Sequence, residues 1–141
     1  MPDQILKTIL AALVNQIDTQ TTNIAYTNYK PKFDAHQNMA PGKLPACIIY
    51  LGRSTTGHSI TSTNEYNLIA LVQIIVEPGT DDDTLYDYQK EVRDAINTDI
   101  SLGATCITCL STDDWAPSTF TSEQSKNVVL SYTIRYWEDF P

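Results

Sequence analysis

The sequence has few cysteines, no long hydrophobic run and few basic residues, and each of these shortages excludes a class of protein. Its three cysteines are an odd number, which argues against a secreted disulfide scaffold and favours assembly in a reducing cytosol. No segment is apolar for long enough to span a bilayer, and Asp3 and Lys7 lie where a signal peptide needs a basic start and an unbroken apolar run. We therefore expect a soluble chain with no membrane partner.

Basic side chains are outnumbered by acidic ones, at 9 lysines and arginines against 17 aspartates and glutamates, which gives a net charge of -8. The basic residues are also scattered along the chain. A protein that binds duplex DNA needs a cluster of them to release counterions from the phosphates. The sequence therefore predicts no direct DNA binding, although an acidic surface would let DNA slide past because like charges repel.

The length of 141 residues predicts a single domain, 1–141, with one hydrophobic core. Two segments show the apolar spacing of amphipathic helices. The first covers residues 4–17, with Asp3 placed to cap its first turn. The second covers residues 81–99 and opens on three consecutive aspartates, at the end where the helix macrodipole favours negative charge.

The other apolar segments have the composition of strands. Strands are predicted at residues 24–26, 46–51, 65–77, 105–110 and 126–137. Strands and helices are segregated rather than regularly alternating, in the order α-β-β-β-α-β-β. This order predicts an α+β domain, in which both helices pack on one face of a mainly antiparallel sheet that contains a long hairpin.

The predicted strand at 65–77 is apolar on both faces, so it is expected to be central in the sheet. Its even-numbered residues form one face, which the helices can cover. The second face includes Ile69, Leu71 and Ile75, and these residues need another cover. A neighbouring subunit is the natural candidate.

A polar stretch rich in glycine, serine and threonine, residues 52–64, joins the two strands of the hairpin. We interpret it as a long arm, because a connection too long for a tight turn generally contacts something. The alternative is a tip with no role. The expected contacts with a subunit or another partner are Arg53, His58, Ile60 and Glu65 in and beside the arm, and Ile69, Leu71 and Ile75 on the second face.

The spacing Cys106-x-x-Cys109 is the nearest approach to a catalytic signature. A redox pair needs its first cysteine at a helix N-terminus, whereas the flanking residues here favour a strand. Strand residues three apart have Cα atoms about 10 Å from each other, beyond the roughly 7 Å reach of a disulfide. Zinc would need two more ligands, and Cys47, His36 and His58 have no ligand-like spacing. We therefore interpret all three cysteines as packing residues, with a thiol- or metal-dependent enzyme that uses Cys106 and Cys109 as the alternative.

No other cluster has the pattern of a catalytic or cofactor site. The three aspartates that open the second helix diverge, and no calcium-loop spacing follows them. Neither histidine has a neighbouring serine or cysteine in a pattern that would make it a general base. Phosphate-binding, dinucleotide-binding and nucleophile-elbow motifs do not occur. The sequence therefore predicts a protein that is not an enzyme and that has no cofactor or metal.

Five segments from about Ile5 to Trp137 carry a family resemblance through their core-packing patterns: "LPACIIYLG", "YNLIALVQIIVE", "DDTLYDYQKEVRDAINTD", "ISLGATCITCL" and "VVLSYTIRYW". The third contains the helical pattern E-V-x-x-A-I-x-x-D, followed by L-G and a strand. Its residues here are Glu91, Val92, Ala95, Ile96, Asp99, Leu102 and Gly103. In this order the segments resemble the tail terminator family of long-tailed bacteriophages, small proteins that cap the tail tube.

The resemblance implies a structural virion protein of the tail and neck, assembled in the cytoplasm of the host bacterium. It implies a hexameric ring stacked on the last ring of tail tube protein, which stops tube polymerisation and offers its opposite face to the head-tail connector. DNA would pass through the central channel without specific binding, and part of the acidic excess would line that channel. The arm would reach the tube or a neighbouring subunit.

Two further interpretations stay open beside the tail terminator and the thiol- or metal-dependent enzyme. Another neck component, such as a tail completion or head-closure protein, is the closest alternative, because those proteins also have small α+β domains and ring symmetry. A monomeric ligand-binding module is the other, and it would bury its second sheet face internally.

Overall fold

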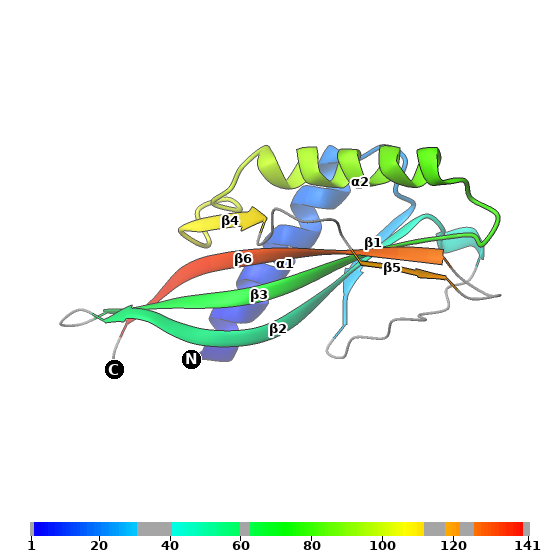
Figure 1. The fold of residues 1–141 in the computed structure, drawn as a ribbon. Coiled ribbons are helices and arrows are strands. Elements are labelled where there is room, and N and C mark those ends of the chain that lie inside the picture. Colours follow the sequence, from blue (N-terminus) through cyan, green and yellow to red (C-terminus); the bar gives the residue numbers. More distant parts are fainter. Residues whose placement is uncertain (1, 31–40, 60–62, 112–117, 122–125, 140–141) are drawn as a thin grey trace.

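The computed structural model describes residues 2–30, 41–59, 63–111, 118–121 and 126–139, which form two helices and one sheet (Figure 1). The helices are α1 (Pro2–Gln20) and α2 (Asp82–Asn97), and the strands are β1 (Tyr26–Tyr29), β2 (Ala46–Ser59), β3 (Thr63–Val76), β4 (Thr108–Ser111), β5 (Ser118–Thr121) and β6 (Lys126–Asp139). The α+β class and the predicted element order are confirmed, with β5 as an additional short strand. Within these ranges no helix is long and apolar enough to cross a membrane.

The sheet has the strand order β1-β2-β3-β6-β4, and β5 also pairs with β6. Every pairing is antiparallel except that of β1 with β2, which is parallel. β4 and β5 share the outer edge of β6, where β5 pairs with residues 126–129 and β4 with residues 132–135. The two-sided apolar strand, β3, therefore lies in the middle of the sheet, as its sequence predicted.

Both helices pack on the same face of the sheet and form the main hydrophobic core with it. Burial of each large apolar side chain contributes roughly 1.5–3 kcal/mol, so this face supplies most of the stabilisation. The sheet contributes alternate residues of β3 and β6, and each helix contributes one stripe. The fully or almost fully buried members are Ile9, Leu13 and Ile17 of α1, Leu85, Val92 and Ile96 of α2, Leu68, Ala70, Val72, Ile74 and Val76 of β3, and Val128, Leu130, Tyr132, Ile134 and Tyr136 of β6.

The helix starts differ from each other in how they are capped. Asp81, predicted as part of the negatively charged start of the second helix, is the residue that caps α2: its backbone is extended, and its carboxylate accepts a hydrogen bond from the backbone N–H of Thr84 at 2.9 Å. α1 instead begins at Pro2, a residue that suits the first helical position because it lacks an N–H. Asp3 therefore lies inside the first turn of α1, and the prediction that it caps this helix was wrong.

The second face of the sheet is closed by the chain itself over part of its area. Ala46, Ile48, Tyr50 and Ile75 form a second buried cluster there, each with at most 1 % of its surface exposed. The Tyr50 hydroxyl donates a hydrogen bond to Oε1 of the buried Gln73 at 2.8 Å. The expectation that Ile75 needs a neighbouring subunit as its cover was therefore wrong.

The strands β2, β3 and β6 are each 14 residues long and extend beyond both helices as a three-stranded arm (Figure 1). The register pairs Ser59 with Asn64 across β2 and β3, and Thr63 with Asp139 across β3 and β6. Residues 52–64 were expected to form a polar connection between shorter strands. Residues 60–62 lie outside the described ranges, and all the others belong to β2 or β3, so the predicted strand ends were wrong.

Two β-bulges interrupt the pairing of β2 in the arm, one between Leu51 and Ser54 and the other between Thr56 and His58. Each bulge contains a glycine, Gly52 in the first. A bulge bends its strand and increases the local twist, and glycine tolerates the backbone angles that this requires. The arm is therefore a bent extension of the sheet and not a flexible connection.

Candidate interaction surface

The part of the second sheet face that lies toward the arm carries several large apolar side chains. Residues directly opposite each other in an antiparallel pair share a face, so the register gives their positions. Leu110 of β4 lies opposite Thr133 of β6, and Thr133 lies opposite Ile69 of β3. Leu71 and Trp137 are on the same face, because side chains alternate with a period of two. We call Ile69, Leu71, Leu110 and Trp137 the open patch.

The open patch is exposed to solvent in the single chain. The exposed fractions are 37 % for Ile69, 47 % for Leu110 and 61 % for Trp137, while Leu71 is half-buried. The exposed Arg135 lies between Thr133 and Trp137 on this face. Apolar side chains gathered on one face, with a charged residue among them, indicate a surface that another molecule covers.

The sequence-predicted residues of the second face separate into two groups. Ile69 lies in the open patch, where a partner can reach it, and the half-buried Leu71 lies at its border and packs against the second buried cluster. Ile75 is enclosed by the second buried cluster with 0 % exposure, so it contacts no partner in this conformation. The difference arises because residues of β1 and of the segment before β2, Tyr26 and Leu44, pack against that end of the face.

The sequence-predicted residues of the arm are brought to neighbouring strands. Arg53 lies in the first bulge of β2, and His58 pairs in register with Glu65 of β3. Glu65 in turn pairs with Trp137 of β6, which connects the arm to the open patch. Ile60 lies outside the described residues.

Leu110 and Trp137 were not among the contact residues predicted from the sequence. In the regular alternation of β6, Trp137 lies on the opposite face from the buried even-numbered residues Val128 to Tyr136. This pattern could have identified it as a surface residue from the sequence. Leu110 carried no such signal, because its position depends on which strand β4 pairs with and in which register. The two residues together double the number of apolar groups on the patch.

The family-like helical pattern in α2 has a structural role that the contacts explain. Val92, Ala95 and Ile96 are buried against the sheet and α1. Glu91 binds the segment between α1 and β1: its carboxylate accepts hydrogen bonds from the backbone N–H groups of Thr22 and Asn23 at 2.7 and 2.9 Å. These contacts fix α2 against the end of α1.

The last residues of the same pattern build the turn that follows α2. Asp99 accepts hydrogen bonds from the Ser101 hydroxyl at 2.6 Å and from the backbone N–H groups of Ser101 and Gly103 at 3.0 and 2.9 Å. The Ser101 and Gly103 hydrogen bonds lower the pKa of Asp99. Leu102, Gly103 and Ala104 have φ angles of 50°, 69° and 65°, a conformation that is strained for the two residues with a Cβ. Leu102 is nevertheless buried, with 1 % of its surface exposed, and this burial offsets the strain.

This turn changes the environment of the two closely spaced cysteines. Only Cys109 lies in β4, whereas Cys106 lies in the turn before it, so the prediction that one strand carries both was wrong for Cys106. Burial raises the pKa of Cys106 to about 11 and the pKa values of Cys47 and Cys109 to about 12. A nucleophilic or redox-active thiol needs a lowered pKa, so these shifts disfavour such a role. All three thiols are free.

The aspartates at the start of α2 are engaged in capping and in an ion pair. Asp81 is the cap, and Asp82 accepts a hydrogen bond from Lys126 at 2.7 Å. The Lys126 ammonium also binds the carbonyl oxygen of Thr80 at 2.9 Å, which fixes the start of β6 to this loop. In the described part of the chain, no group of three or more histidine, cysteine or acidic residues could hold a metal ion.

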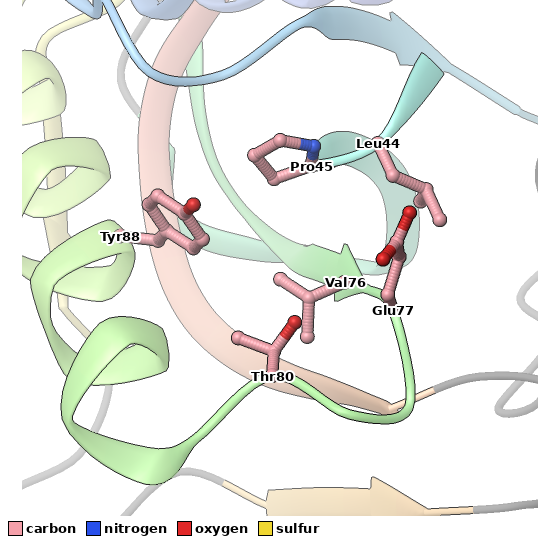
Figure 2. A pocket seen from close by; sticks show the side chains of 6 residues that line it. All are labelled: Leu44, Pro45, Val76, Glu77, Thr80 and Tyr88. Carbon is pink, nitrogen blue, oxygen red and sulfur yellow. The ribbon is translucent and has the colours of Figure 1, made fainter. Parts of the chain in front are cut away.

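Two hollows are formed by described residues on the helix side of the sheet. Figure 2 shows the smaller one, about 130 Å³, between the end of β3 and α2; it is lined by Leu44, Pro45, Val76, Glu77, Thr80 and Tyr88. It has room for a few water molecules. The wider hollow, about 360 Å³, lies between α1 and the turn after α2, and Gln16 and Asp99 are in its wall. Gln16 donates there to the carbonyl oxygens of Ala95, Ile96 and Asp99 at 2.9, 2.8 and 3.1 Å.

No protein-family model matches the chain, and a comparison with curated proteins gives no match. The site is therefore defined by its geometry: an apolar patch on an open sheet face, continuous with a three-stranded arm, on the side of the sheet opposite the helices.

Proposed function

We propose that this protein is a tail terminator: a structural virion protein that forms a hexameric ring on the end of a bacteriophage tail tube. The ring stops further addition of tube protein and presents its other face to the head-tail connector. The observation that carries this proposal is the arm, since β2, β3 and β6 project beyond the helices as one paired unit. The sequence resemblance from Ile5 to Trp137, which includes the long hairpin, supports the same assignment.

An arm of this construction suits the task of docking on another ring. Three paired strands hold their shape better than a loop, so little conformational entropy is lost when a partner binds. His58 and Glu65 pair in register within the arm, and we expect the arm to meet the tube or the next subunit.

The open patch supports self-assembly. Ring subunits contact their neighbours through two different surfaces, and the apolar residues Ile69, Leu110 and Trp137 provide one such surface. The net charge of -8 suits a ring through which DNA passes, because an acidic lumen repels the phosphates and gives no specific binding. Assembly in the host cytoplasm is consistent with the free thiols.

A tail terminator has to be distinguished from another neck component, such as a completion or head-closure protein. An early stop codon in the gene, in the phage that encodes it, separates the two when tail lengths in the lysate are measured by electron microscopy. Overlong tubes without heads support the tail terminator. Tails of normal length that fail to join filled heads identify a completion or head-closure protein, and intact infectious particles contradict any neck function.

The thiol- or metal-dependent enzyme is disfavoured by the raised pKa values of Cys106 and Cys109. The monomeric ligand-binding module is disfavoured by the exposure of Ile69 and Trp137, since such a module would cover the second face with its own chain. Native mass spectrometry of the purified protein tests both alternatives, because a six-subunit mass without zinc is expected only for the ring.

A further inference from the structure

The smaller hollow is bounded by the end of β3, the segment before β2, and α2 (Figure 2). Tyr88 extends into it from α2 on one side, and Leu44 and Glu77 lie on the other. Pro45 and Val76 lie between them. Its volume of about 130 Å³ is well below the roughly 300–1,000 Å³ of pockets that hold a drug-sized ligand or a cofactor. The hollow therefore suits a group no larger than one side chain.

Three polar side-chain groups in the wall of this hollow are available to a ligand. They are the carboxylate of Glu77 and the hydroxyl groups of Thr80 and Tyr88. Within the described ranges none of the three groups has a hydrogen-bond partner, although the backbone N–H and carbonyl oxygen of Thr80 are both engaged. Thr80 and Tyr88 are half-buried, whereas Glu77 is exposed. A ligand that enters the hollow can therefore gain hydrogen bonds without breaking any within the chain.

The charge around the hollow favours a cation. Glu77 is in its wall, and three consecutive aspartates, residues 81–83, follow Thr80 directly. Lys126 is the basic residue that contacts this segment, and its ammonium already binds Asp82 at 2.7 Å and the Thr80 carbonyl oxygen at 2.9 Å. The remaining acidic groups leave the mouth of the hollow negative, so an anion is repelled and a cation is attracted.

The other lysine beside the hollow, Lys43, does not supply that cation. It precedes Leu44 in the chain, but its ammonium lies over the Tyr26 ring, 4.7 Å from the ring centre. Tyr26 packs against the second buried cluster, on the opposite face of the sheet. Neither Lys43 nor Lys126 is in the wall of the hollow, so in this conformation the cation comes from another molecule.

An ammonium group on an alkyl stem matches these features. It has three N–H donors, and the hollow has three acceptor groups. Its charge pairs with Glu77, and the face of the Tyr88 ring also attracts cations. The alkyl stem packs on Pro45 and Val76, the apolar part of the wall.

We propose that this hollow binds an alkylammonium group, which is either the side chain of a lysine on a partner protein or a free small amine. The two sources share the ammonium and the stem, and they differ in whether a peptide backbone has to fit at the mouth. This site is separate from the tail terminator function and does not depend on it.

Titration of the full chain with n-butylammonium chloride tests the site, with the ionic strength held constant and amide NMR spectra recorded. Saturable shifts are expected at the amides of Val76, Glu77 and Tyr88 at about millimolar concentrations. Butan-1-ol has the same stem without the charge, and it is expected to bind at least about fivefold more weakly.

Two substitutions in the wall have matched controls outside it. Glu77→Gln removes the carboxylate charge, and Tyr88→Phe removes the hydroxyl group while keeping the ring. Each is expected to weaken butylammonium binding by about two- to fivefold. The controls are Asp83→Asn and Tyr86→Phe at exposed positions of α2, and they are expected to change the affinity little. Circular dichroism shows whether each variant keeps the fold.

A second ligand, N-acetyl-lysine N-methylamide, distinguishes the two sources. If it binds as tightly as butylammonium or more tightly, the site accepts a lysine side chain of a partner protein. If only butylammonium binds, the ligand is a free amine.

Three results overturn the proposal, and each leaves the tail terminator function intact. Equal affinity for butan-1-ol and butylammonium shows that the carboxylate has no role. Equal losses in the wall variants and in their controls show a general attraction of cations to the acidic surface. The absence of saturable shifts up to about 100 mM amine shows that the hollow binds no alkylammonium group.

Discussion

Glu91 of α2 and Asn23, in the segment between α1 and β1, are joined by two hydrogen bonds, from the backbone N–H and the side-chain amide of Asn23 at 2.9 and 2.8 Å. Together with the hydrogen bond from the Thr22 N–H, the Glu91 carboxylate accepts from three donors that would otherwise bind water. Glu91 therefore connects α2 to the segment that follows α1 through a single charged group. The first residue of the E-V-x-x-A-I-x-x-D pattern in α2 thus stabilises the fold.

Replacement of Glu91 is expected to destabilise the fold in a pH-dependent way. Burial alone would raise the pKa of Glu91, but the hydrogen bonds from Asn23 and Thr22 outweigh it, so the pKa lies below its usual value. A lowered pKa in the folded state gives stability that is present above the unfolded pKa, about 4.3, and lost as the pH falls below it. The difference in unfolding free energy between the wild type and Glu91→Gln should therefore be larger at pH 6 than at pH 3. Urea titrations at both pH values measure it, and Glu77→Gln, at an exposed glutamate, is the control.

Gln16 is expected to stabilise the end of α2 from outside the helix. Its amide donates to the carbonyl oxygens of Ala95 and Ile96 in the last turn of α2 and of Asp99 just beyond it, as a C-terminal cap would; the Ala95 oxygen also accepts from the Thr98 N–H and the Asp99 oxygen from the Leu102 N–H. Gln16→Leu removes all three hydrogen bonds and should lower the unfolding free energy by about 1–3 kcal/mol. Gln20→Leu, at the exposed end of α1, is the matched control and should have little effect on the urea midpoint. Equal effects of the two substitutions would contradict a capping role.

Ile69 and Ile75 test the division of the second sheet face, because both lie on the same face of β3. Ile75 is fully buried, so Ile75→Ala should cost about 2–5 kcal/mol of stability. Ile69 is 37 % exposed, so Ile69→Ser should change the urea midpoint little but weaken ring formation in native mass spectrometry. If both variants still assemble, the open patch is not part of the contact between subunits.

The thiols are expected to react slowly and to make the fold sensitive to alkali. At pH 8, alkylation of Cys106 by iodoacetamide should be at least about a hundredfold slower than in the urea-unfolded chain, because its raised pKa leaves little thiolate. The folded state also keeps protons that the unfolded state releases above about pH 8.5, so stability should fall as the pH rises from 9 toward 11. Mass spectrometry gives the alkylation rate at each cysteine, and thermal unfolding at several pH values gives the trend. Fast alkylation of folded Cys106 at pH 7 would revive the thiol-enzyme alternative.

The arm is expected to be needed for docking and dispensable for folding. Thr56 and Tyr66 pair in register, so replacing residues 57–65 with Asn-Gly shortens the hairpin at a position that a two-residue turn can close. This variant should form rings but should not sediment with tail tubes. A second variant, His58→Ala/Glu65→Ala, keeps the arm and shows whether these side chains or the arm's length is needed. Normal docking of the shortened variant would refute the proposed role.

The sequence predicted the elements whose signal lies in their own residues. The strict alternation in β6 and the helical spacing in α2 identified both elements and their buried faces, because burial on one side imposes a period on the sequence. The cap at Asp81 is also a local feature, because an aspartate before a helix can accept a hydrogen bond from an N–H of its first turn.

The features that the sequence did not predict depend on partners distant along the chain. The arm portion of β2 is rich in serine, threonine and glycine, and it is a strand because β3 pairs with it. Cys106 lies outside the strand because Asp99, earlier in the chain, organises a turn by accepting hydrogen bonds from the backbone N–H groups of Ser101 and Gly103. The open patch needs residues from β3, β4 and β6, and only the register brings them to one surface.

The two bulges of β2 affect the direction of the arm but not which side chains lie on each of its faces. Gly52 and Arg53 together lie opposite Ile69 in the first bulge, so deletion of Gly52 would leave Arg53 opposite Ile69 and every later pair unchanged. The arm would then point elsewhere with the same residues on each face. The direction of the arm can therefore be adjusted by the gain or loss of one glycine, while its chemistry is adjusted by substitution, and neither change touches the buried core.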